Sequence, residues 1–183
     1  MHRWTTDLLA HLAAGRAELL DAIEDVAPED RMRCPSVGRW SVANVLSHLA
    51  RTEGQVAALL QRQTRSAGSL ARAPQLDADA VSVVSTFDGV AVLDRSERVA
   101  APAFAQPDLG QAFEDATNGL VRARARLEQV VVDADSLDMR GVRQQHHLFG
   151  VLDFYQWVAF AGFHERRHSQ QLREIAAGLG RGA

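Results

Sequence analysis

The sequence of 183 residues lacks lysine altogether, since all 20 of its basic residues are arginine. Schiff-base catalysis, which requires a lysine amine, is therefore excluded. A single cysteine, Cys34, excludes an internal disulfide and any zinc site built from several thiolates. With five prolines and 46% hydrophobic residues, the composition is ordinary for a globular protein and argues against disorder over most of the chain.

Long apolar runs are also missing. No stretch of about 18 consecutive apolar residues is present, so we expect no helical membrane span and no membrane partner. The N-terminal stretch MHRWTTDLLAHL lacks the charged-then-apolar layout of a signal peptide. These two features predict a cytoplasmic protein.

Charge of one sign is not concentrated anywhere in the sequence. The net charge is −3, and the arginines are scattered, with Arg122, Arg124 and Arg126 forming the densest group. A nucleic-acid-binding protein would carry a basic patch or stripe, so no nucleic-acid partner is expected. The length predicts a single domain over residues 1–183.

Four segments carry apolar residues at helical spacing. They cover residues 4–26, 42–63, 109–132 and 149–178. The first ends at Pro28. The second begins after Ser41, which is a good N-cap, and the preceding Trp40 can pack on Val45. The third is expected to bury a stripe that starts at Leu109. All four segments have the length of helices in a bundle.

The connection between the second and third helices is long, covering residues 64–108. Its apolar pieces AVSVV and GVAVL are compatible with short helices or with a small pair of strands. Because no run of strands alternates with the helices, we predict an all-α protein, an antiparallel four-helix bundle with one long crossover.

The fourth segment contains His164-Glu165-Arg166-Arg167-His168, which matches the HExxH signature of zinc peptidases. At about 100° per residue, the two histidines lie within about 40° of each other on the inward face of the helix. Two buried imidazoles need partners, which either a shared metal ion or separate hydrogen bonds would supply. The pattern alone leaves both interpretations open.

A third histidine on another helix would favour the metal. His48 lies on the second helix at the edge of its apolar stripe, where it can reach a cavity between helices. Together with His164 and His168 it would form a facial three-histidine set with open coordination positions, as in catalytic metal sites. The alternative is a histidine at the boundary of the core with no ligand role.

The remaining histidines are weaker candidates. His146 and His147 precede His164 by about 17 residues, roughly 25 Å along a helix, and are expected to be loop residues that cap or line the entrance. His2 and His11 have no obvious partner and are expected at the surface.

A peptidase is not favoured, because the third ligand of that class is missing. The extended HExxHxxGxxH form is absent, and Glu174 lies within two turns on the same helix as the two histidines.

Two carboxylates are candidate catalytic residues. Glu165 is either a base that flanks the histidines or, as we favour, a solvated helix charge. Glu53 falls within an apolar stripe, so it needs a partner such as a water on the metal, a ligating histidine or an arginine. Asp153 raises the same question on the fourth helix. Cys34 is interpreted as a small loop residue rather than a fourth ligand or a redox thiol.

Two stretches carry a resemblance to a known family. WSVANVLSHLARTEG, which contains Trp40 and His48, and the later HHLFGVLDFYQWVAFAGFHERRHSQQLREI together resemble the DinB/YfiT-like superfamily of metal-dependent enzymes. The resemblance spans essentially the whole chain. It implies a four-helix bundle, often a homodimer, with a divalent metal such as nickel or zinc on three histidines that match His48, His164 and His168.

The resemblance also directs the functional hypotheses. Relatives include transferases that use a low-molecular-weight thiol, mycothiol or bacillithiol, and a hydrolase. Our leading hypothesis is a metal-dependent transferase that activates such a thiol for attack on a small electrophilic substrate. Trp157, Phe160 and Phe163 would shape an apolar pocket, unless they are simply core. The alternatives are a hydrolase that uses metal-bound water and a non-catalytic bundle that binds a ligand or partner.

Overall fold

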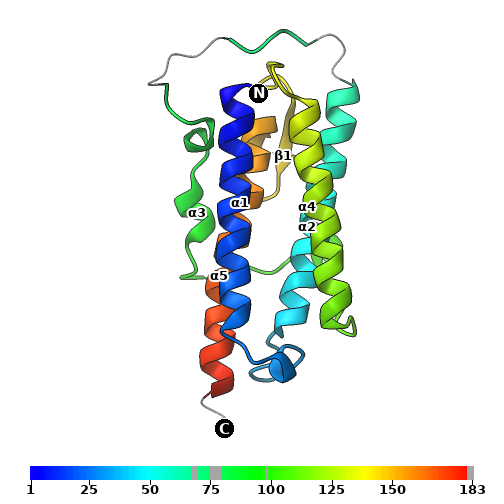
Figure 1. Ribbon diagram of the computed structural model, residues 1–183, viewed down its shortest axis with the longest axis vertical. Coiled ribbons are helices and arrows are strands. Elements are labelled where there is room, and N and C mark those ends of the chain that lie inside the picture. Colours follow the sequence, from blue (N-terminus) through cyan, green and yellow to red (C-terminus); the bar gives the residue numbers. More distant parts are fainter. Residues whose placement is uncertain (67–69, 75–79, 98, 181–183) are drawn as a thin grey trace.

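The computed structural model describes residues 1–66, 70–74, 80–97 and 99–180, and within them four long helices form the body of the molecule (Figure 1). Their bounds are α1, Arg3–Glu24; α2, Val42–Ser66; α4, Phe113–Asp133; and α5, Phe154–Gly180. Each lies on one of the four segments with helical spacing. The predicted all-α bundle is confirmed.

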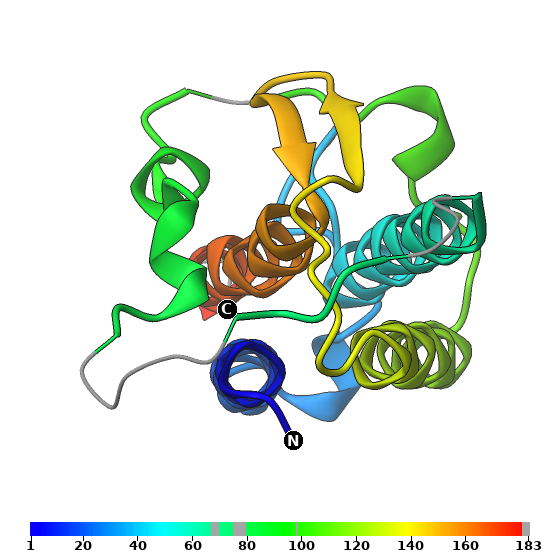
Figure 2. The same ribbon diagram turned by 90° about the horizontal axis from the view of Figure 1, so that it is seen from above.

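The long crossover determines the directions of the helices. In Figure 1, α1 and α5 run downward, whereas α2 and α4, which precede and follow the crossover in the sequence, run upward. The closest pairs are α1 with α5 and α2 with α4, and α2 also packs against α5 (Figure 2). Consecutive long helices are thus antiparallel except for α2 and α4, which the crossover makes parallel.

The start of α2 follows the prediction closely. The backbone N–H of Asn44 donates to Ser41 Oγ, and the N–H of Ser41 donates to Asn44 Oδ1, so the two residues cap the helix reciprocally. Trp40 packs against the apolar cluster that contains Val45. This capping fixes where the helix that carries His48 begins.

Two predicted helix boundaries were wrong. Leu109 is 70% exposed, and α4 begins only at Phe113. The fourth helix begins at Phe154 rather than near residue 149, because an antiparallel hairpin of β1, Arg143–His146, and β2, Gly150–Asp153, precedes it. Asp153 therefore does not face inward from the helix.

Asp153 instead caps α5. Its Oδ1 accepts from the backbone N–H of Gln156, while its own N–H donates to Gln156 Oε1. This reciprocal pair satisfies two donors at the strand-to-helix junction, which explains how the chain passes from β2 into α5 without a loop.

The crossover contains short helices, which was one of the two predicted alternatives, the other being a small pair of strands. They are η2, Val83–Thr86, from AVSVV; α3, Gly89–Leu93, from GVAVL; and η3, Ala103–Ala105. α3 packs against α5, and η3 packs against α2. In the part of the chain that the structure describes, no helix is both long and apolar enough to cross a membrane.

The apolar core is divided into two clusters along the bundle. One includes Leu8, Leu12, Val56, Leu60, Leu127 and Phe154. The other includes Leu19, Ile23, Leu46, Leu49, Leu120 and Leu172. Each long helix contributes residues to both clusters and carries one buried or partly buried charged residue between them. These residues are Arg16, Glu53, Arg124 and Glu165. A polar layer therefore separates the clusters.

Candidate metal centre

Three histidines from two helices converge at one point. His48 comes from α2, and His164 and His168 come one turn apart from α5. Nε2 of His164 lies 3.3 Å from Nε2 of His48 and 3.1 Å from Nε2 of His168. All three ligand nitrogens lie within 4.8 Å of one another. The structure thus brings together the three positions that the sequence singled out.

Two of these imidazoles are oriented by hydrogen bonds at their other nitrogen. His48 Nδ1 lies 2.6 Å from the carbonyl oxygen of Ala105 in η3, and His168 Nδ1 lies 2.7 Å from Gln171 Oε1. A carbonyl oxygen can only accept, so His48 Nδ1 carries the proton; an amide oxygen at Gln171 assigns the same tautomer to His168. Each Nε2 then presents a lone pair to the centre of the cluster.

Burial keeps the cluster uncharged. Desolvation lowers the pKa of His48, and desolvation together with the neighbouring histidines lowers the pKa of His164 and His168 well below 6.5. Nε2 of His48 and Nε2 of His168 lie within hydrogen-bond distance of Nε2 of His164, and a cation between the three rings would instead accept a lone pair from each. The donor set, all neutral imidazole nitrogen, suits borderline ions such as zinc and nickel.

The spacing also fits such an ion. At a metal–nitrogen distance of about 2.05 Å, nitrogens 3.1 to 3.3 Å apart subtend roughly 100° at the cation, which is between octahedral and tetrahedral angles. Three ligands on one side leave further positions open towards the cavity. A closed structural site would need a fourth protein ligand, and Cys34, which is exposed, is not among the clustered residues.

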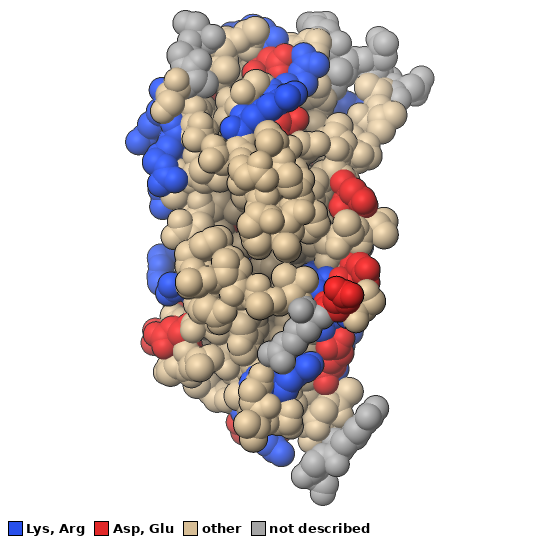
Figure 3. Space-filling view, turned by 180° about the vertical axis from the view of Figure 1, so that it is seen from behind, with Lys and Arg blue, Asp and Glu red and all other residues tan. Residues whose placement is uncertain are grey.

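A cavity of about 1060 Å³ opens from the cluster between α2, α5, the hairpin and the crossover. The hairpin and η3 lie on the side of the bundle away from α1 and α4 (Figure 2). That side is uncharged over much of its middle, with charged residues towards its edges (Figure 3). Trp157 and Phe160 line the cavity and also belong to the apolar core, so both interpretations of these residues hold. Phe163 does not line the cavity, because it packs against His11 and Gly89.

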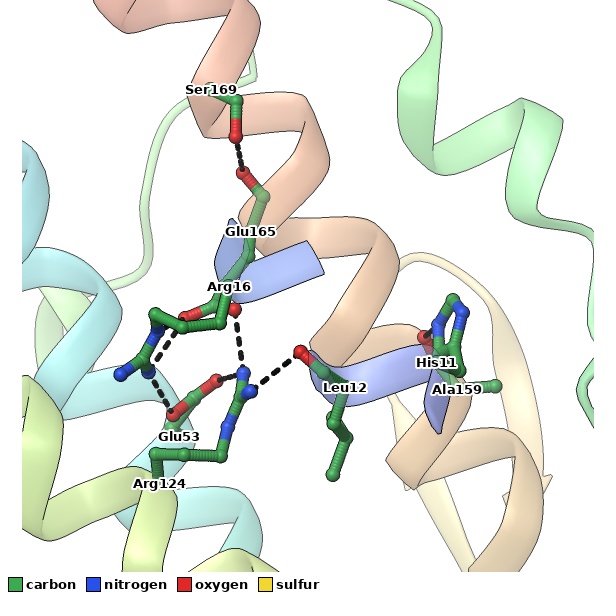
Figure 4. A network of polar contacts seen from close by, with 8 residues as sticks. All are labelled: His11, Leu12, Arg16, Glu53, Arg124, Ala159, Glu165 and Ser169. Carbon is green, nitrogen blue, oxygen red and sulfur yellow. Dashed lines mark hydrogen bonds and ion pairs between the residues drawn. The ribbon is translucent and has the colours of Figure 1, made fainter. Parts of the chain in front are cut away.

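The two candidate carboxylates, Glu53 and Glu165, meet in the polar layer of the core (Figure 4). Arg124 Nη2 lies 2.5 Å from Glu53 Oε1 and 2.6 Å from Glu165 Oε2. Arg16 Nη2 lies 2.8 Å from Glu165 Oε1 and 3.5 Å from Glu53 Oε2. Glu165 is fully buried, so its interpretation as a solvated charge was wrong.

Opposing effects act on the pKa of Glu53 in this network. Desolvation, followed by repulsion from Glu165, raises the pKa of Glu53 to about 7, although both arginines act in the opposite direction. Neither carboxylate lines the cavity. Of the partners considered for Glu53, the structure provides the arginines, and a catalytic role for Glu53 or Glu165 stays a prediction.

A model of the DinB superfamily matches residues 7–172 of the chain. The chain belongs to the DinB superfamily. It is 24% identical over 166 residues to the uncharacterized protein YuaE of Bacillus subtilis (strain 168), with 87% of this chain and 91% of YuaE covered. Its fold is similar to that of TT2238, a four-helix bundle protein, with a TM-score of 0.60, 23% identity and coverage of 93% and 98% of the two chains.

Membership gives the cluster a context. The DinB superfamily is metal-binding, and the three clustered histidines are where this member of it offers ligands. The likeness to TT2238 shows the fold alone. The resemblance drawn from the two sequence stretches is thus confirmed at the level of the family.

The other histidines of this DinB-superfamily chain lie outside the cluster. His146 is a buried strand residue rather than a loop residue, although it does line the cavity together with His147. His11 is partly buried, and its Nε2 lies 2.9 Å from the carbonyl oxygen of Ala159. His2 caps α1 by accepting from the N–H of Trp4. Both histidines thus have hydrogen-bond partners, and the surface position expected for His11 was wrong, whereas His2 is half-buried at the start of α1.

Sequence reasoning missed several residues that support the site. Gln171 follows His168 by three positions on the same helix face, so its spacing offered a signal. Arg16 and Arg124 each interrupt an apolar stripe, which indicates a buried partner. The carbonyl of Ala105 left no signal, because any residue type could supply it.

Proposed function

We propose that this chain is a metal-dependent transferase. His48, His164 and His168 would hold a divalent cation, nickel or zinc, and the cavity would receive a low-molecular-weight thiol such as mycothiol or bacillithiol beside a small electrophilic substrate. The observation that carries the proposal is the convergence of three neutral imidazole nitrogens on the wall of a large cavity. A site with open positions on a cavity is the catalytic arrangement.

The chemistry divides between the cation and the chain. A bound divalent cation supplies Lewis acidity, which lowers the pKa of a coordinated thiol enough to deprotonate it outright. His48 and His168 are held for this task by Ala105 and Gln171, so the ligand nitrogens need no reorganisation. Trp157 and Phe160 would give the substrate an apolar wall on one side of the cavity.

The position of the buried carboxylates favours a thiol over water. Attack by water usually benefits from a general base within hydrogen-bond reach of the nucleophile. Glu53 and Glu165 are bound by Arg16 and Arg124 and do not line the cavity. Since the pKa of a free thiol, about 8.5, is far below that of water, about 15.7, coordination alone deprotonates a thiol more readily, so the thiol transferase is preferred to the hydrolase.

The cavity itself supports a substrate larger than water. Its volume of about 1060 Å³ is at the upper end of the range for small-molecule sites, room enough for a thiol and a second reactant. Arg62 lies on its wall, exposed, with no carboxylate partner among the described residues, and is free to attract an anionic group. The homodimer, the cytoplasmic location and the identity of the substrate remain predictions.

The test begins with the metal content of protein purified without a metal-binding tag. We expect near-stoichiometric nickel or zinc in the wild type and in His147→Ala, a matched exposed histidine on the same cavity. His48→Ala and His164→Ala should lose it. A wild type that lacks metal and takes up neither ion on incubation would overturn the proposal and leave a non-catalytic helical bundle.

The loaded protein then distinguishes the two reactions. Transfer of mycothiol or bacillithiol to a simple electrophile, lost in His48→Ala, would support the transferase. Hydrolysis of a simple ester or amide without thiol, with the same dependence on His48, would instead make the chain a hydrolase.

A further inference from the structure

One buried histidine of the cavity is not used by the metal centre. His146, the last residue of β1, is 3% exposed and lines the cavity. Its Nδ1 accepts the backbone N–H of Leu148 at 3.1 Å and of Phe149 at 3.2 Å, the two residues that turn the hairpin towards β2. Because Nδ1 accepts two hydrogen bonds, the proton of the neutral ring must be on Nε2.

The imidazole is held firmly in this orientation. Its centroid lies 4.9 Å from that of Phe149 in a stacked arrangement, 4.7 Å from Phe160 and 5.0 Å from Trp157. Aromatic neighbours on several sides, together with the two backbone donors, leave the ring little rotational freedom. A donor in such a position is preorganised for a ligand.

Other buried donors on this wall are already engaged. Trp157 Nε1 donates to the carbonyl of Gln144, and Thr52 Oγ1 donates to the carbonyl of His48. Within the described ranges, Nε2 of His146 has no hydrogen-bond partner in the protein. Nε2 is accessible from the cavity, so an oxygen of a bound ligand can accept its hydrogen bond.

His146 is also close to the three-histidine cluster. The ring centroid of Phe160 lies 5.2 Å from that of His164 in a stacked arrangement, and the same ring contacts His146. A single aromatic ring therefore separates the two imidazoles. Both line one continuous cavity. A small molecule whose reacting atom is at the cluster can therefore reach Nε2 of His146 with another of its groups.

We propose that His146 is a substrate-binding residue of this cavity, whose Nε2–H donates to an oxygen acceptor, a carboxylate or carbonyl group, of the molecule held at the three histidines. The inference rests on the proposed function and deepens it, because it names a group that the substrate must carry. That acceptor would lie beside His146, which the ring of Phe160 separates from His164. A purely apolar substrate would leave the donor unsatisfied.

The ring acts as a neutral donor. Burial, followed by the charge of His147, lowers the pKa of His146 to about 4, so the imidazole is uncharged at neutral pH. It therefore recognises an acceptor by a hydrogen bond rather than by charge, and its contribution is the same throughout the neutral range.

The experiment uses the full-length protein loaded with cobalt, whose thiolate charge-transfer absorption reports binding. The probes are mercaptocarboxylic acids of increasing chain length and alkanethiols of matched length. In the wild type, we expect one chain length at which the carboxylate binds about tenfold or more tightly than the methyl-ended thiol. His146→Phe should lose this preference.

Two variants keep the test interpretable. His146→Gln can accept from the hairpin backbone with its amide oxygen and donate with its amide nitrogen, so part of the preference should survive. His147→Gln, the exposed neighbour, should behave as the wild type. Unchanged binding of the methyl-ended thiols reports an intact site in each variant. A carboxylate preference that persists in His146→Phe overturns the inference.

Failure of the proposed function would be visible separately. If cobalt does not bind, the metal proposal fails, and the same mercaptocarboxylates are titrated into metal-free protein while the ring nitrogens of His146 are followed by long-range ¹H–¹⁵N NMR. A protonated Nε2 whose resonance shifts on addition of the acids, but not of the alkanethiols, supports the subsite. A protonated Nδ1, or no shift, overturns it.

Discussion

Gln171 Oε1 lies 2.7 Å from Nδ1 of His168, one turn further along α5. The pair directs the lone pair of His168 Nε2 to the point where His48 and His164 converge. An outer hydrogen bond of this kind both fixes the tautomer and raises the basicity of the ligand nitrogen.

Removal of this hydrogen bond should weaken metal binding without removing a ligand. We expect Gln171→Leu to lower the affinity for zinc or nickel by about 10- to 100-fold, measured by competition with a chromophoric chelator. Gln171→Glu, which keeps an acceptor at this place, should bind at least as tightly as the wild type. Equal affinities for the Leu and Glu variants would show that Gln171 does not position His168.

Arg124 connects the two carboxylates of the polar layer. Arg124→Met leaves Glu53 and Glu165 buried with only Arg16 to neutralise them, and we expect the free energy of unfolding at pH 7 to fall by about 3–5 kcal/mol. Urea denaturation measures the change.

The same helix provides a control for this variant. Arg126 is exposed and bonds Gln61, so Arg126→Met should change the free energy of unfolding by only about 0.5 kcal/mol. Adding Glu53→Gln to Arg124→Met removes one of the unpaired charges and should restore part of the loss. A cost for Arg124→Met no larger than that for Arg126→Met would contradict a stabilising role of the layer.

A close approach of α1 and α5 depends on Gly15. A Cβ at this position would lie 2.8 Å from the carbonyl oxygen of Gly162, an atom of the backbone that cannot move aside. Gly15→Ala should therefore lower the free energy of unfolding by about 1–3 kcal/mol. At Gly54 of α2, an added methyl group would meet no atom within 4 Å, so Gly54→Ala should stabilise the protein by up to about 1 kcal/mol. Thermal denaturation measures the change in stability of each variant. A Gly15→Ala variant more stable than the wild type would contradict the close contact between Gly15 and Gly162.

Acidification should destabilise the metal-free protein partly through His146. Its pKa is lowered from 6.5 to about 4 in the folded state, mainly by desolvation, so the unfolded chain binds more protons between these values. The stability present above pH 6.5 is thus lost as the pH falls towards 4. His146→Asn, which can still accept from the hairpin backbone but does not titrate, should reduce the slope of the free energy of unfolding by up to about 1.4 kcal/mol per pH unit. Denaturation curves measured at several pH values give the slope, and identical slopes in the two proteins would refute the prediction.

The sequence by itself determined the parts of the molecule that depend on near neighbours along the chain. Helical periodicity located the four long helices, and the Ser41 cap located the start of α2. The spacing of His164 and His168 placed them on one face because the helical repeat is fixed by backbone geometry. The same periodicity placed the start of the third helix too early, at Leu109. An apolar residue that precedes a helix extends the apparent pattern even when its side chain is exposed.

Only the tertiary structure decided which distant groups meet. His48 reaches His164 because α2 packs against α5, and the carbonyl of Ala105 reaches His48 because the crossover returns along α2. The buried position of Glu165 likewise depends on Arg124, which comes from a different helix. His146 is buried because the hairpin folds back onto the start of α5, where Phe160 contacts its ring. Local periodicity does not encode these contacts, because they depend on the order in which the helices pack and on the path of the long connection between them.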